Sequence, residues 1–242
     1  MSWIKFSTLT LLLVGSTATL AETLVVRSSG PSSRSFPPGK LLPDTGRIVL
    51  KANDQLVILD DKGTRTLKGP GSFVPARPTK VAEKSGTATT LAALAGQKDE
   101  RRARIGAVRG TPPAESGNGP VNLWFADTSR GGAVCVADPG AVTLWRPDVS
   151  APALATLATD ADRSWALSWA SGQATMAWPA DAPISNGARY RISFDGSDKA
   201  VEFRFAALDP MPDGVASMAR ALIASDCQPQ LDLLIATTGT GE

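Results

Sequence analysis

Short apolar runs, separated by glycine, proline and acidic turns, occur along most of the chain and predict a mainly β protein. In the first part, the alternation predicts strands at residues 24–26, 47–52, 55–59 and 64–67. Residues 60–63 read Asp-Asp-Lys-Gly, which places a glycine where a hairpin turn requires a positive φ angle. We therefore expect a small antiparallel β unit over residues 22–76.

A second and stronger β pattern covers residues 120–209, and its spacing of strands and turns is typical of a β-sandwich. A hairpin turn is expected at residues 195–198. The predicted strands cover residues 121–125, 132–137, 142–145, 163–169, 174–178, 189–194 and 201–205.

After residue 209 the apolar period changes to three and four, which predicts helices. The first contains Met218 and Leu222 on its apolar face, with Asp213 as the expected cap. The second begins at Pro229 and runs to about residue 236. We expect this tail, residues 210–242, to pack on the sandwich.

Residues 77–119 differ from both β blocks in being rich in proline, glycine and cations, with a short helix expected over 87–103. Arg101, Arg102 and Arg104 form a candidate binding surface there. One interpretation is docking onto an anionic surface, and the other is a solvated basic linker.

The first 21 residues have the layout of a cleavable secretory signal: Lys5, then an apolar run, then small residues ending at Ala21. The run is shorter than the roughly 20 residues that span a bilayer. We therefore expect an exported, periplasmic protein without a transmembrane anchor. The alternative is a buried N-terminal helix.

The two cysteines, Cys135 and Cys227, fit an exported protein. Neither lies in a Cys-x-x-Cys motif, which disfavours a redox or zinc site, and an oxidising compartment favours a structural disulfide. The alternative is a pair of buried thiols. If the cysteines pair, the bridge attaches the helical tail to the sandwich.

Residues 41–73, with their short strands, acidic-glycine turn and Gly-Pro-x-x-Phe ending, resemble the FecR-type domain of bacterial envelope regulators. The resemblance implies a periplasmic sensing or interaction module. Those regulators place a sigma-factor-binding segment and a membrane helix before the domain, whereas a signal sequence is expected in this chain, so sigma-factor control is not implied. Separately, residues 186–190 resemble the approach to the tyrosine corner of immunoglobulin-like sandwiches, although Ile192 stands where the usual cysteine would be.

The chain has no histidine, and its 25 basic residues nearly balance 23 acidic ones. The first fact removes histidine-dependent nucleophiles and metal sites, and the second disfavours nucleic acid as a partner. The chain contains no P-loop, no Gly-x-Ser-x-Gly elbow and no calcium loop, and no serine after residue 21 has a lysine three residues later. We expect no catalytic residue, metal or cofactor.

Two residue types remain as candidates for function. Aspartates such as Asp60, Asp127 and Asp138 lie in predicted turns, where backbone hydrogen bonding explains them better than acid-base catalysis does. Trp165 and Trp169 share one strand face, and Trp178 is expected nearby. These tryptophans form either the sandwich core or an exposed platform for a sugar ring or a partner.

Together these patterns predict an exported, non-enzymatic binding, sensing or interaction protein of the bacterial envelope, with an envelope protein as its partner. The alternative is a carbohydrate-binding or carbohydrate-processing protein that uses the tryptophan face and pairs of aspartates.

Overall fold

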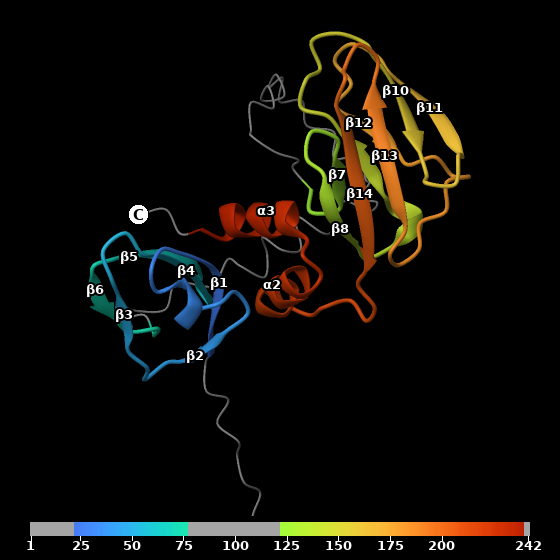
Figure 1. Cartoon of the computed structure of the whole chain (residues 1–242). Coiled ribbons are helices and arrows are strands. Elements are labelled where there is room, and N and C mark those ends of the chain that lie inside the picture. The colour runs from blue at the N-terminus through green and yellow to red at the C-terminus, as the bar shows by residue number, and fades with distance from the viewer. Residues whose placement is uncertain (1–21, 77–121, 240–242) are drawn as a thin grey trace, which may run out of the picture.

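A computed structural model describes residues 22–76 and 122–239 of the chain (Figure 1). It confirms the predicted fold class: a small β unit, a β-sandwich and a C-terminal pair of helices. The expected signal sequence and the basic segment with Arg101, Arg102 and Arg104 lie outside the described residues. In the described ranges, no helix is long and apolar enough to cross a membrane.

The N-terminal unit contains a four-stranded sheet of order β2-β1-β4-β5 and a two-stranded sheet of β3 and β6. Its hairpin turn between β4 and β5 is the predicted one, with φ of 116° at Gly63. The strands are β1 (Glu22–Ser29), β2 (Leu41–Pro43), β3 (Ile48–Leu50), β4 (Gln55–Asp60), β5 (Gly63–Lys68) and β6 (Gly71–Phe73).

The sandwich pairs a five-stranded sheet of order β11-β10-β13-β14-β8 with a three-stranded sheet of order β12-β9-β7. Most neighbouring strands are antiparallel, but β8 runs parallel to β14, and β7 runs parallel to β9. The strands are β7 (Phe125–Asp127), β8 (Gly132–Val136), β9 (Thr143–Trp145), β10 (Ala153–Ala158), β11 (Ser164–Trp169), β12 (Thr175–Ala177), β13 (Arg189–Phe194) and β14 (Ala200–Ala207).

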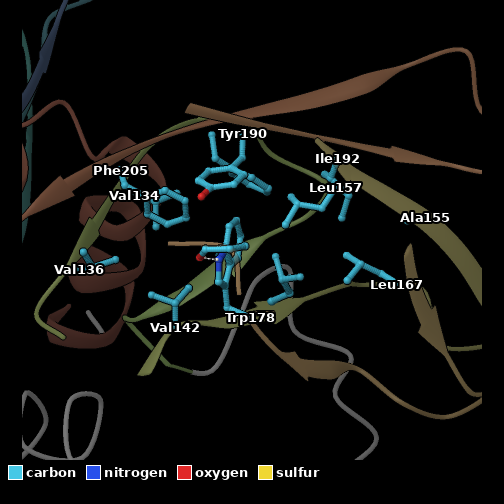
Figure 2. Packing of buried hydrophobic residues seen from close by; sticks show 14 of the residues in the cluster. Val134, Val136, Val142, Ala155, Leu157, Leu167, Trp178, Tyr190, Ile192 and Phe205 are labelled. Atoms are coloured by element: carbon cyan, nitrogen blue, oxygen red, sulfur yellow. Dashed lines mark hydrogen bonds between the residues drawn. The ribbon is translucent and has the colours of Figure 1, made fainter. Parts of the chain in front are cut away.

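An aromatic cluster fills the space between the two sheets (Figure 2). The Trp178 ring meets Tyr190 and Phe205 edge-on, at centroid distances of 4.8 and 5.0 Å, and its indole N–H donates to the Ala182 carbonyl at 2.8 Å. The Tyr190 hydroxyl donates to the Pro183 carbonyl at 2.6 Å. This bond ties the start of β13 to the backbone of the segment before it.

The tail forms helices α2 (Val215–Ala224) and α3 (Gln228–Thr238). Pro229 lies in the first turn of α3, as the sequence predicts. The expected cap of α2 is wrong: Gly214, with φ of 78°, occupies the N-cap position, and no side chain caps the helix. Glycine adopts a positive φ angle without the steric cost that a side chain such as that of aspartate would impose at this position.

The helical pair packs against both β blocks, which the sequence did not indicate. Leu24 and Leu59 of the N-terminal sheet share one buried cluster with Leu222 and Leu231 of the helices. The same cluster includes Cys135, Ala206 and other sandwich residues. Figure 1 shows α2 and α3 between the N-terminal sheet and the sandwich. The tail therefore joins the two blocks through one hydrophobic core.

Polar contacts reinforce this junction on both sides. The buried Gln230 amide accepts from the Cys135 N–H at 2.6 Å and donates to the Cys135 and Leu123 carbonyls, both at 2.8 Å. On the other side, the Thr64 hydroxyl donates to the Ile235 carbonyl at 3.0 Å, and Arg27 forms an ion pair with Asp232.

The predicted disulfide between Cys135 and Cys227 is confirmed, and both residues are completely buried. It connects β8 to the residue before α3, and their Cα atoms are 5.9 Å apart. The bridge thus attaches the tail to the sandwich as expected, one helical turn from Gln230.

A buried carboxylate organises the turns of the N-terminal unit. Asp54 accepts the Ser32 N–H at 2.8 Å through one oxygen and the Lys51 N–H at 2.5 Å through the other. Burial of Asp54 raises the pKa of its carboxyl, but the hydrogen bonds from Ser32 and Lys51 outweigh this effect and lower the pKa below its ordinary value of 3.8.

Replacing Asp54 with asparagine should therefore destabilise the protein at neutral pH, because an amide N–H₂ would face one of the two N–H donors. A carboxyl with a lowered folded pKa stabilises the fold fully above its unfolded pKa, and this contribution disappears as the pH falls through the folded value. The urea midpoints of wild type and Asp54→Asn should differ at pH 7 and converge in strong acid. A difference that stays constant with pH would contradict this assignment.

Candidate functional site

A cavity of about 510 Å³ lies at one end of the sandwich, beside β7. Its size is in the range of small-molecule and side-chain binding pockets. Its walls come from the turn before β7, the end of β8, the 3-10 turn η2 (Pro139–Ala141), strands β9 and β12, and the segment after β14. The lining residues are Asn122, Trp124, Phe125, Val136, Ala137, Asp138, Ala141, Val142, Thr143, Thr175 and Met211.

Apolar atoms form the greater part of this cavity's surface. Trp124 and Phe125 are half-buried, and Met211 is 46% exposed. A flexible thioether beside two aromatic rings can adapt to an apolar group of variable shape.

Local hydrogen bonds hold the two aromatic residues at the cavity. The Asn122 side chain accepts the Trp124 N–H at 2.9 Å, and the Asn122 carbonyl accepts the Phe125 N–H at 3.2 Å. Phe125 then begins β7 and is paired with Thr143 of β9. The turn at Asn122 thus presents both rings on a fixed backbone.

Polar residues also line the cavity. Asp138 caps η2 by accepting the Gly140 N–H at 2.9 Å. Thr143, which is half-buried, and Thr175, which is exposed, also line the cavity. The arrangement suits an apolar or aromatic group flanked by a hydrogen-bonding partner.

A second cavity, of about 410 Å³, is strongly polar. Arg189, Arg191 and Arg204 line it, together with the carboxylates of Asp160, Glu202 and Asp226. Arg191 lies 3.5 Å from Glu202 and 3.9 Å from Asp160, so two of the three lining carboxylates already have a cationic partner. The cavity beside β7 is therefore the better candidate for recognition.

The tryptophan platform considered from the sequence is not formed. Trp169 is completely buried and Trp178 is 9% exposed, because both rings fill the sandwich core. Trp165 is half-buried, with the Arg163 guanidinium 5.0 Å above its ring. Strand alternation correctly grouped Trp165 with Trp169, but that face points inward.

The aspartates that the sequence offered as candidates for catalysis stabilise turns instead. Asp60, Asp127 and Asp138 each accept an N–H group two residues further along the chain. Within residues 22–76 and 122–239, no group of three or more histidine, cysteine or acidic residues could hold a metal ion.

The sequence reasoning missed Trp124 and Met211 as candidate site residues. A signal for Met211 was present, because it lies between Pro210 and Pro212, where neither a strand nor a helix can bury it easily. Compared with protein-family models, curated proteins and solved structures, the chain shows no match.

Proposed function

We propose that this chain is an exported, non-enzymatic binding protein of the bacterial envelope that holds an apolar or aromatic side chain of a protein partner in the cavity beside β7. The observation that carries the proposal is the exposed Met211 side chain, which lines the same cavity as Trp124 and Phe125. Exposed apolar groups framed by polar residues are typical of protein interaction sites.

The export part of the proposal rests on the first 21 residues and on the disulfide. Cys135–Cys227 needs an oxidising compartment to form and persist. Cell fractionation with N-terminal sequencing should find a chain that begins at Glu22 in the periplasmic fraction. A cytoplasmic chain that retains residue 1 would contradict export.

The FecR-like unit supports an interaction role with a second surface. Val49 on β3 and Val74 just after β6 are 58% and 55% exposed, within or beside the run that resembles FecR-type domains. We propose that this face senses or contacts an envelope component, as the resemblance implies.

A site-specific photo-crosslinker tests the binding site. With benzoylphenylalanine at Met211, the exported chain should form a discrete adduct with an envelope protein in intact cells. The matched control is Ser197, an exposed residue of the β13–β14 turn that does not line the cavity. The same adducts at both positions, or none at Met211, would refute the proposed site.

The carbohydrate alternative has narrower support, since of the three proposed platform residues only Trp165 keeps a partly exposed ring. A glycan array decides between the two functions. Glycan binding that is lost in Trp165→Ala or Trp124→Ala would favour the alternative, and an array without binding would leave the protein partner as the better account.

A further inference from the structure

Strand β11 forms an outer edge of the sandwich, with β10 on its inner side (Figure 1). It pairs with β10 over six consecutive residues without a bulge, from Ala153↔Trp169 to Ala158↔Ser164. No other strand of the described ranges pairs with β11. Its backbone is therefore a regular template for one more strand.

The other edges in the described ranges are short or covered, as is usual in proteins that avoid edge-to-edge association. Strands β2, β7 and β12 have three residues each, and β2 ends in Pro43. The β8 edge is capped by the Gln230 amide, which bonds both backbone groups of Cys135. The β5 edge forms a bridge from Thr64 to Gly239 and carries Arg65 and Lys68.

In contrast, β11 reads Ser-Trp-Ala-Leu-Ser-Trp and carries neither charge nor proline. Ser164, Ala166 and Ser168 point to the outer face and are exposed, whereas Leu167 and Trp169 point into the core. Nothing in this sequence opposes the addition of a strand.

We propose that β11 pairs antiparallel with β11 of a second copy of this chain, which joins the two five-stranded sheets across a two-fold axis. Residues that face each other across an antiparallel pair lie on the same face of the sheet. In a two-fold pair of identical strands, one residue must therefore face its own copy, and the axis runs between the two. With Leu167 on the axis, Ala166 faces Ser168 of the second copy, and Trp165 faces Trp169 of the second copy.

This register is self-complementary in size and charge. Small side chains meet on the outer face, and on the inner face the half-buried Trp165 gains an aromatic cross-strand neighbour. The flanking cation Arg163 faces Ser171 of the second copy, so like charges do not meet. No residue of β11 lines the cavity beside β7, and the pairing is therefore independent of the proposed function.

Two double variants at the same exposed positions test the pairing and its register. In Ala166→Lys/Ser168→Lys, two pairs of lysines face each other across the axis, and in Ala166→Lys/Ser168→Glu each lysine faces a glutamate. Sedimentation velocity on the mature, disulfide-bonded chain at about 1–100 µM should show a concentration-dependent dimer for wild type. The lysine pair should weaken it at least about tenfold, and the lysine-glutamate pair should retain it.

Comparing the two variants controls for folding, because both replace the same outward-facing side chains. A wild-type chain that stays monomeric over this range would overturn the proposal. So would a double-lysine variant that dimerises as tightly as wild type, or a lysine-glutamate variant that is as weak as the double-lysine one.

Discussion

Replacing Cys135 and Cys227 together with alanine is expected to lower the free energy of unfolding by about 4–5 kcal/mol, since the bridge closes a loop of 92 residues. The effect should reach beyond the sandwich. Because α2 and α3 also contact the N-terminal sheet through Leu24 and Leu59, a loosened tail removes part of that unit's core as well.

Urea denaturation followed by two probes measures this effect. Far-ultraviolet circular dichroism reports the whole fold, and tryptophan fluorescence reports the second block, where the described tryptophans lie. Both midpoints should fall together in the double variant. A loss below about 1 kcal/mol would mean that the tail is held by packing and by Gln230 without help from the bridge.

Trp178→Ala is expected to cost about 3–5 kcal/mol, the usual range for removing a large aromatic side chain from a packed core. The substitution removes the edge-on contacts with Tyr190 and Phe205 and leaves the Ala182 carbonyl without its indole donor. The substitution would leave a cavity in the buried cluster between the two sheets (Figure 2).

The matched control is Trp165→Ala, which removes the same side chain from a half-buried position on β11. It should cost measurably less than Trp178→Ala, since part of the Trp165 side chain is already exposed to water. Equal losses for the two variants would contradict the placement of Trp178 in the core and Trp165 at its margin.

Much of the fold could be predicted from local patterns. Apolar alternation and turn chemistry located β4, β5 and the hairpin between β13 and β14, where Gly196 has the positive φ that the turn requires. The compartment suggested by the first residues predicted the disulfide correctly. These features depend on residues near one another in the chain or on a single chemical rule.

Three strands were missed for identifiable reasons. Strand β6 follows Gly69 and Pro70 and begins with Gly71, a run that reads as a break in the chain. Strand β10, central to the five-stranded sheet, reads Ala-Leu-Ala-Thr-Leu-Ala, and alanine is depleted in strands, so its alternation was not counted. Strand β2 lies in a stretch rich in proline and glycine that reads as a loop. Both β2 and β10 form strands because neighbouring strands pair with them, which their own composition does not indicate.

The site and the junction could not be predicted because they depend on distant residues. The tail's contact with β1 joins segments roughly 200 positions apart, and no periodicity shows which surface an amphipathic helix will cover. Likewise, the cavity assembles Trp124, Thr175 and Met211 from three separate segments. Taken one at a time, each of these residues looked like a core or loop residue. Only the folded chain brings them together at one cavity.

The proposed binding site is tested most directly by filling its cavity. Ala141 is exposed and lines the cavity, so Ala141→Trp should occupy the space without disturbing the sandwich core, and Ala161→Trp, at an exposed turn outside it, is the control. The measurement is the affinity of each purified chain for the envelope protein crosslinked through Met211. We expect Ala141→Trp to bind at least about tenfold more weakly than wild type, with Ala161→Trp unchanged. Equal affinity of wild type and Ala141→Trp would contradict the proposed site.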